Sequence, residues 1–159
     1  MRAVPAAGIG SRSKLERRTG AKRSFAFPRA VRLRAARDFE SCRTPQFRAS
    51  LRWLSLAARI GDLDSDGARV RVGITVGKRM ARKSVQRNLV KRVLRDAARH
   101  ALPALQTSAA RRVDVVLRLK AAFPDADRMT LTEFRRALRA EADLLLQRLA
   151  AHLSTPVRP

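Results

Sequence analysis

The 159-residue chain has little cysteine, few aromatic residues and few acids. Its single cysteine, Cys42, excludes an internal disulfide and any zinc site built from several cysteines, and it favours an intracellular, cytoplasmic protein. The two histidines, His100 and His152, lie far apart and have no partner at ligand spacing, so we assign neither to catalysis or metal binding. No run of about 18 apolar residues occurs, so we expect no helix that spans a membrane.

What the chain has in excess is positive charge. Lysine and arginine number 36 against 13 acids, which gives a formal net charge of +23. Repulsion among these charges opposes a compact state unless a polyanion neutralises it. Nucleic acid is therefore the leading class of partner. A membrane surface is the alternative, and the arginines that interrupt the longest apolar stretches argue against it.

Composition divides the chain into three parts. Residues 1–24 contain seven cations, one acid and three glycines without a periodic apolar pattern, which predicts a disordered basic arm. The alternatives are an organellar transit peptide, whose amphipathic helix Pro5 and the glycines disfavour, and a start codon placed too far upstream. Residues 25–153 form the predicted domain, and residues 154–159 form a frayed tail.

Within the domain, apolar spacing predicts the order helix, strand, strand, helix, strand, helix. The acidic, glycine-containing segment 61–67 is expected to be the loop of a hairpin between the first two strands. The helix that starts near Ser84 is expected to end around His100, before Pro103, and Thr130 with Glu133 forms a capping-box pattern for the last helix. The other predicted elements are a short helix over 35–42, strands within 46–59, 70–76 and 112–120, and an apolar stripe of Phe134, Leu138, Ala142, Leu145 and Leu149 on the last helix. This pattern predicts an α+β domain with helices over one face of the sheet.

The helix near Ser84 is one-sided in charge. Steps of about 100° per residue place its aliphatic side chains in one half of the circumference. The other half is a single arc of Arg87, Asn88, Lys91, Arg92, Arg95 and Arg99. Like charges four residues apart destabilise a helix by a few tenths of a kcal/mol, so an ordinary solvated face mixes the two signs. We interpret the arc as a surface for phosphates, which guanidinium groups bind with release of counterions; the alternative is a helix that tolerates the repulsion in salt.

Residues 72–100, VGITVGKRMARKSVQRNLVKRVLRDAARH, resemble the signature region of the bacterial ribonuclease P protein subunit. The similarity consists of a strand that ends in a basic turn, followed by a helix with the pattern Arg-Asn-x-x-Lys-Arg-x-x-Arg. It extends from about residue 25, through Phe39 and the strand VDVVLRLK, to about residue 153. The resemblance implies a small ribosomal-protein-like sandwich with a left-handed βαβ crossover.

The resemblance also implies a function. The chain is expected to be the protein subunit of a ribonucleoprotein endoribonuclease and to assist its catalytic RNA in removing the 5′ leader from precursor tRNA. The expected partners are the catalytic RNA subunit and precursor tRNA, with no membrane and no obligate protein partner. Mg²⁺ is expected to act with the RNA, and we assign no catalytic or metal-ligating residue to the protein.

Two sets of binding residues follow from the resemblance. The set expected to bind the RNA subunit is Lys78, Arg79, Arg82, Lys83, Arg87, Asn88, Lys91, Arg92 and Arg95. The set expected to bind the leader is Phe25, Phe39, Arg43 and Trp53. The chain departs from the family pattern at Leu89, where an arginine is usual, and at Arg43, where a second aromatic is common. Without the resemblance, core packing is the alternative for Phe39, and it remains the alternative for Trp53.

Two other functions compete with this one. The first is a structural RNA-binding protein of the ribosome type that shares the fold and has no processing role. The second is a self-contained nuclease, which the lack of an acid or histidine cluster disfavours.

Overall fold

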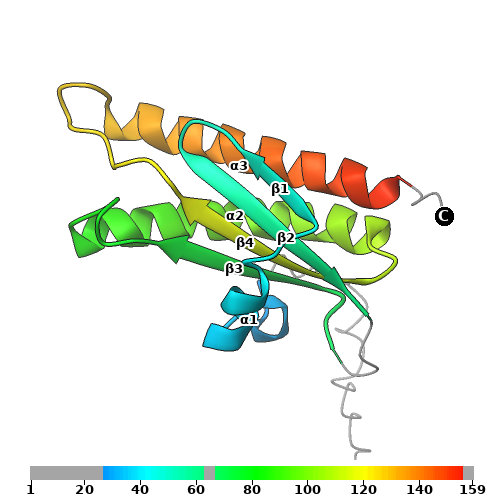
Figure 1. Ribbon diagram of the computed structural model, residues 1–159. Helices are drawn as coiled ribbons and strands as arrows, with labels where there is room; N and C mark the ends of the chain where they lie inside the picture. The colour runs from blue at the N-terminus through cyan, green and yellow to red at the C-terminus, as the bar shows by residue number, and fades with distance from the viewer. Residues whose placement is uncertain (1–26, 63–66, 156–159) are drawn as a thin grey trace, which may run out of the picture.

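The computed structural model describes residues 27–62 and 67–155, which form an α+β domain (Figure 1). Its elements in chain order are the 3₁₀ helix η1 (Arg29–Val31), α1 (Ala36–Ser41), β1 (Phe47–Ser50), β2 (Leu54–Gly61), β3 (Val70–Val76), α2 (Ser84–Ser108), β4 (Arg112–Leu119) and α3 (Leu131–Ser154). The predicted basic arm, residues 1–24, lies outside the described residues, as do the last four residues of the predicted tail.

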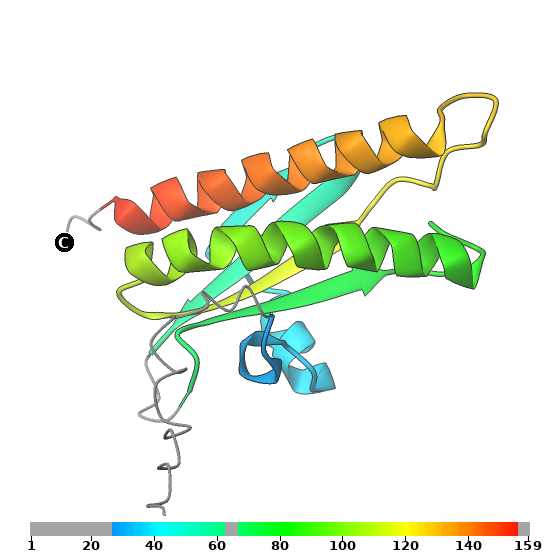
Figure 2. The same cartoon turned by 180° about the vertical axis from the view of Figure 1, so that it is seen from behind.

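The four strands form one sheet in the order β1-β2-β4-β3. β1 and β4 each pair antiparallel with β2, whereas β3 and β4 are parallel and joined through α2. Figure 2 shows the sheet from the helix side, with β3 and β4 both running to the right and β4 above β3. The β3-α2-β4 connection is therefore left-handed, as the resemblance implied, against the usual right-handed rule.

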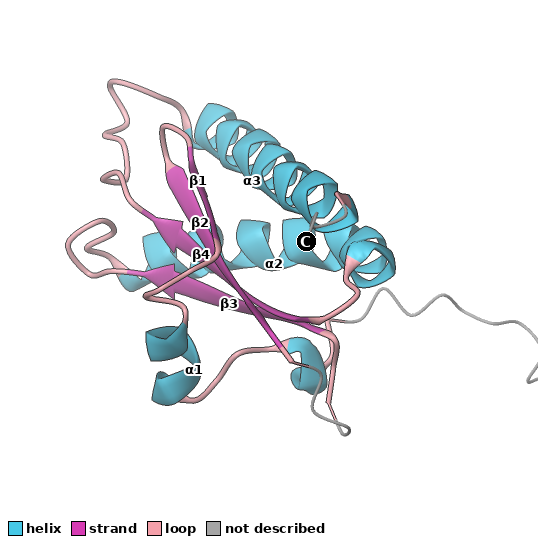
Figure 3. Cartoon of the chain, turned by 45° about the vertical axis from the view of Figure 1, so that its right-hand side comes forward, coloured by secondary structure: helices cyan, strands magenta, loops and turns pink. Residues whose placement is uncertain are grey.

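The two faces of the sheet are covered unequally. Figure 3 shows α2 and α3 on one face and the short α1 on the other. The main core lies under the two long helices and includes Leu54, Leu56, Val72 and Leu117. Every residue of the predicted α3 stripe is buried there, from Phe134 to Leu149. α1 covers only a small second cluster of Leu33, Cys42 and Val116, with Phe39 packed against it.

Local chemistry explains where α3 begins and how the side chains of β3 alternate. The Thr130 hydroxyl accepts a hydrogen bond from the Glu133 amide at 3.3 Å, and the Glu133 carboxylate accepts one from the Thr130 amide at 2.9 Å. This is the predicted capping box at the start of α3. On β3, Val70, Val72, Ile74 and Val76 pack into the main core, as strict alternation predicted.

Two expectations about the first strands were wrong. The segment 46–59 contains two strands, β1 and β2, which are joined by a tight turn in which the Leu51 amide donates to the Leu54 carbonyl at 2.9 Å. The loop 61–67 does not close a hairpin, because β4 lies between β2 and β3 in the sheet. The turn at Arg52 and Trp53 contains no glycine, proline or asparagine, so the usual signals for a hairpin are missing there.

The expected end of α2 was also wrong, because the helix continues through Pro103 to Ser108. Proline removes one backbone hydrogen bond from a helix and usually ends or kinks it. Here Pro103 is exposed, while Leu102 and Leu105 on either side of it are buried against the core. Burial of those two leucines, worth about 1.5–3 kcal/mol each, offsets the cost of the proline.

Candidate nucleic-acid interface

The residues predicted to bind the RNA subunit lie on the solvent side of α2 and on the turn before it. The exposed members are Lys78, Arg79, Arg82, Lys83, Asn88, Arg92 and Arg95, and Arg87 and Lys91 are half-buried. Val90, Leu94 and Ala97 on the opposite side of the helix are fully buried, as the amphipathic pattern predicted, whereas Val85 in the first turn is 74% exposed and does not join the apolar side. Within the described part of the chain, none of the cations in this set forms an ion pair with an acid.

The one acid on this stretch of α2, Asp96, is already engaged. Its carboxylate pairs with Arg99 on the same helix and with Arg139 on α3. Arg139 also pairs with Asp143 at 2.9 Å, so these charges join the two long helices. Asp96 therefore neutralises only Arg99, the last cation of the predicted arc, on this helix, and the cations from Lys78 to Arg95, on α2 and on the turn before it, keep their positive charge without an acidic partner among the described residues.

Arg87 differs from the other members of the arc because its guanidinium binds the backbone. Its Nη1 donates to the carbonyl of Ala81 at 3.0 Å and to that of Arg82 at 2.7 Å. The amides of Met80 and Ala81 in turn donate to the carbonyl of Gly77 at 3.1 Å. Arg87 thereby fixes the turn that presents the basic side chains of residues 78–83.

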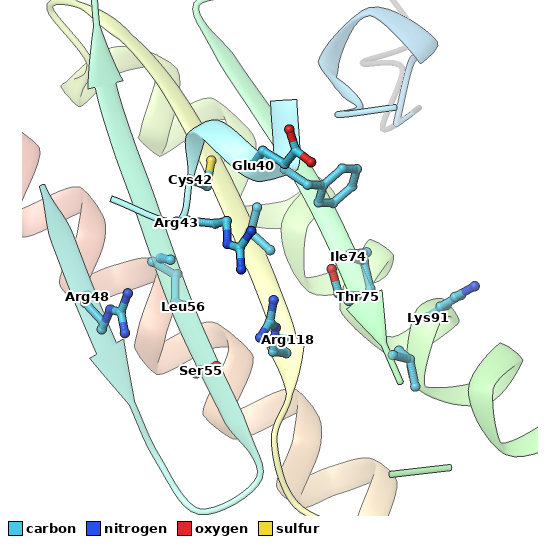
Figure 4. Close-up of a pocket in the computed structure, with 14 residues that line it drawn as sticks. Glu40, Cys42, Arg43, Arg48, Ser55, Leu56, Ile74, Thr75, Lys91 and Arg118 are labelled. Carbon is cyan, nitrogen blue, oxygen red and sulfur yellow. The ribbon is translucent and has the colours of Figure 1, made fainter. Parts of the chain in front are cut away.

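A cavity of about 760 Å³ lies between α1 and the face of the sheet opposite the long helices. Its side chains come from α1, from all four strands and from α2 (Figure 4). They include Phe39 and Arg43 from the α1 segment, Arg48 from β1, Arg118 from β4 and Lys91 from α2. We call this cavity the α1 cleft.

The floor of the α1 cleft consists mostly of small side chains, and the strand register explains why they lie in rows. One row across the sheet contains Arg48, Ala57, Val116 and Gly73, and the next contains Ser50, Ser55, Arg118 and Thr75. Gly73 is buried, and a Cβ atom there would lie 2.5 Å from Cε1 of Phe39. The ring of Phe39 therefore rests directly on the backbone of β3.

The α1 cleft is electropositive. Arg43, Arg48, Arg118 and Lys91 border it, against one acid, Glu40. Burial of the Cys42 thiol raises its pKa, and the negative charge of the nearby Asp114 raises it further. This cysteine therefore contributes no negative charge at neutral pH. A flat aromatic ring beside several cations and a floor of small side chains suits a single-stranded nucleic acid, whose bases stack on rings while its phosphates contact cations.

The structure distributes the predicted leader residues unevenly. Phe39 and Arg43 border the α1 cleft together, whereas Phe25 lies outside the described residues. Trp53 was wrongly placed in this set, because it is only 7% exposed and packs edge to face on Phe134 with ring centroids 5.1 Å apart. Its strand register could not be told from the sequence, and the turn between β1 and β2 directs this ring into the main core.

Sequence reasoning missed Arg48 and Arg118, which border the α1 cleft from β1 and β4. A signal for Arg118 was present in the sequence. The apolar strand 112–119 carries Asp114 and Arg118 four residues apart, which places both on one face by period-two alternation. Arg48 gave a weaker signal, because β1 is only four residues long.

Comparison with known proteins agrees with this geometry. The family model Ribonuclease P matches residues 27–149. The ribonuclease P protein component of Ralstonia pickettii is 33% identical over 132 residues, which are 82% of this chain and 87% of the relative. That of Chromobacterium violaceum is 34% identical over 131 residues, which are 82% of this chain and 92% of the relative. The chain belongs to the ribonuclease P protein family.

Solved structures of ribonuclease P proteins share the fold. The protein from Staphylococcus aureus superposes with a TM-score of 0.57 at 17% identity, over 79% of this chain and 99% of that one. The protein from Thermotoga maritima gives a TM-score of 0.52 at 22% identity, over 74% and 96% of the two chains. The predicted α+β class is thus confirmed.

Three further observations complete the description of this ribonuclease P protein. Residues 27–62 and 67–155 contain no group of three or more histidine, cysteine, aspartate or glutamate side chains arranged to hold a metal ion. No helix in the same part of the chain is long and apolar enough to cross a membrane. Leu89, where the family pattern usually has arginine, is half-buried and packs against the main core.

Proposed function

We propose that this chain is the protein subunit of ribonuclease P and that it assists a catalytic RNA in removing the 5′ leader from precursor tRNA. Membership of the ribonuclease P protein family supports the first part. In the second part, the cationic face of α2 and its preceding turn bind the RNA subunit, and the α1 cleft binds the single-stranded leader. Both steps bring polyanions onto a chain of net charge +23, which relieves its self-repulsion.

The observation that carries this proposal is that the two basic surfaces share a border. Lys91 belongs to the charged side of α2, and it also borders the α1 cleft next to Thr75 and Val76 of β3. β3 is the edge strand of the sheet, so α2 meets the cleft around that edge. An RNA bound to α2 and a leader bound in the α1 cleft would therefore be neighbours, as joint action on one substrate requires.

Within this proposal the residues divide the work. Cations on α2 form phosphate contacts, which position an RNA backbone without reading its sequence. Phe39 provides a stacking surface for a base, and Arg43, Arg48 and Arg118 contact the phosphates on either side of it. We assign the phosphodiester chemistry, and the Mg²⁺ that supports it, to the RNA subunit. Cytoplasmic location stays a prediction.

The ribosome-type structural protein is not favoured as an alternative, because the chain belongs to the ribonuclease P protein family. A self-contained nuclease remains an outcome of the test described next. It would need catalytic groups of the protein's own, and we assign it none.

The proposal is tested by reconstitution. The purified full-length chain is added to a bacterial ribonuclease P RNA at low Mg²⁺, and cleavage of a precursor tRNA is measured. We expect the protein to stimulate cleavage at the leader junction, because it neutralises phosphates that Mg²⁺ would otherwise have to screen. No stimulation would contradict the proposal, and cleavage by the protein without RNA would support the nuclease.

A further inference from the structure

α1 is weakly attached to the sheet by apolar contacts. It has six residues, and none of them is buried. The apolar contacts on this side are Leu33 before the helix, Cys42 after it and Val116 on β4, with Phe39 partly buried among them. So small a cluster cannot by itself fix the direction of a short helix, since helices of this length are unstable in isolation.

A charged contact supplies the missing attachment. Arg71 of β3 faces α1 and donates through Nε and Nη2 to both carboxylate oxygens of Asp114, at 2.8 and 2.7 Å. Asp114 is 8% exposed and lies opposite Arg71 in the parallel register of β3 and β4. The guanidinium also donates to the carboxylate of Asp38 on α1, from Nη2 to Oδ1 at 3.3 Å and from Nη1 to Oδ2 at 3.5 Å.

These contacts differ in strength. The bidentate pair of Arg71 with Asp114 is short and partly shielded from water, and it raises the pKa of Arg71. Arg71 is thus a fixed part of the sheet, whereas the longer contact to Asp38 is the one that reaches α1. The thiol of Cys42 also approaches the Asp114 carbonyl at 3.6 Å, so the segment is attached at both ends to one residue pair.

The attached residues directly precede the two that border the α1 cleft. Asp38 is followed by Phe39, and Cys42 is followed by Arg43. We propose that the contact between Arg71 and Asp38 positions α1, so that Phe39 and Arg43 are held over the sheet in the geometry that binds the leader. Neither Arg71 nor Asp38 borders the cleft, so both act as positioning residues. This inference rests on the proposed leader binding and adds to it the residues that position the site.

The variant Asp38→Asn tests this inference because positioning and simple electrostatics predict opposite results. Removing an acid near the cleft should strengthen binding of a polyanion if charge alone matters. If α1 loses its attachment, the fraction of molecules with a competent cleft falls and the apparent affinity falls in proportion. We expect the preference of the reconstituted holoenzyme for precursor over mature tRNA to drop about fivefold, the effect of a competent fraction of one fifth.

Four further variants separate loss of the attachment from loss of charge. Glu40→Gln removes the same charge from α1 at a residue without an ion-pair partner in the described chain, and it should raise the preference for the precursor slightly. Asp38→Glu keeps the carboxylate and should retain most of the preference. Arg71→Lys keeps the charge beside Asp114 and loses the fork, so it should resemble Asp38→Asn. The double variant of residues 38 and 71 should be no worse than either single variant, because both remove one contact.

Amide hydrogen exchange of the free protein separates this inference from the proposed function. We expect the α1 amides to exchange at least about fivefold faster in Asp38→Asn than in the unmodified chain, with α3 unchanged, because only the local opening of α1 becomes easier. Unaltered exchange in α1, or a leader preference that is kept or raised in Asp38→Asn, would overturn the inference. A lack of leader preference in the unmodified holoenzyme would instead overturn the proposed leader binding, and the exchange rates would still decide whether Arg71 positions α1.

Discussion

The substitution Gly73→Ala should separate the role of Phe39 in leader binding from its role in packing. The new methyl carbon would lie 2.5 Å from Cε1 and 2.9 Å from Cζ of Phe39, and 3.1 Å from Cβ of Leu33. The first two distances are far inside van der Waals contact, so the ring must move. Both atoms lie at the far end of a side chain that can rotate, so the ring can move away from the sheet without unfolding the protein.

The expected change in stability is small because two effects oppose each other. Displacing the ring from its rotamer costs about 0.5–1.5 kcal/mol. Replacing a strand glycine by alanine returns about 0.5–1 kcal/mol, because the unfolded chain loses less conformational freedom on folding. The free energy of unfolding should therefore change by no more than about 1 kcal/mol, which urea denaturation measures.

A loss in leader binding is expected even though the free energy of unfolding changes little. Stacking of one base on an aromatic ring contributes about 1–3 kcal/mol. The ring in Gly73→Ala is displaced rather than removed, so we expect a loss near the lower end, about 1 kcal/mol. The assay compares dissociation constants of the reconstituted holoenzyme for precursor and mature tRNA. Only the precursor should be affected.

Gly61→Ala is the matched control, because Gly61 lies at the end of β2 and a Cβ atom there meets nothing within 4 Å. It should change neither stability nor the preference for the precursor. An unchanged preference in Gly73→Ala would refute stacking on Phe39. A loss of stability of several kcal/mol would show that Phe39 acts as a core residue.

The other predictions concern the cationic face of α2 and the main core. Lys91→Ala should lower the slope of log affinity for the RNA subunit against log salt by about one, and Arg148→Ala on α3, as the control, should leave it unchanged. A slope for Lys91→Ala equal to that of the unmodified chain would mean that Lys91 touches no phosphate. Arg87→Ala should weaken binding more than its charge explains, because it also releases the turn before α2. Trp53→Ala should lower the free energy of unfolding by about 3–5 kcal/mol in a urea titration and leave the tRNA preference of the folded fraction intact. A selective loss of precursor binding would instead return Trp53 to the leader site.

The parts of the fold that follow from local periodicity could be predicted from the sequence. The alternation of β3, the capping box at Thr130 and the apolar stripe of α3 depend on neighbours within one or two turns, and all three are present in the structure. The end of α2 could not be predicted in this way. Pro103 is a strong local signal for a helix end, and only the tertiary burial of the leucines around it outweighs that signal.

The candidate site could be predicted only where one segment carries it. The arc on α2 belongs to one helix and the pair Phe39 and Arg43 to one short segment, α1 and the turn after it, so spacing or family pattern was enough to find them. The cations Arg48 and Arg118 come from separate strands, and their approach depends on the order of the strands in the sheet. That order brings β4 between β2 and β3, which no feature of the 61–67 loop indicates.

The position of β4 in the sheet affects which misfolded states of this protein can persist. The strand pairs with a neighbour on each side, and its alternate residues face opposite sides of the sheet. The main core contains Val113, Val115, Leu117 and Leu119, and the side of α1 contains Asp114, Val116 and Arg118. A slip of one residue would exchange the two sets, sending an aspartate and an arginine into the core and leucine into the cleft. The core penalty makes such a slipped state too costly to populate. Molecules with β4 in a shifted register therefore do not stay folded, and the folded molecules have the native cleft lining.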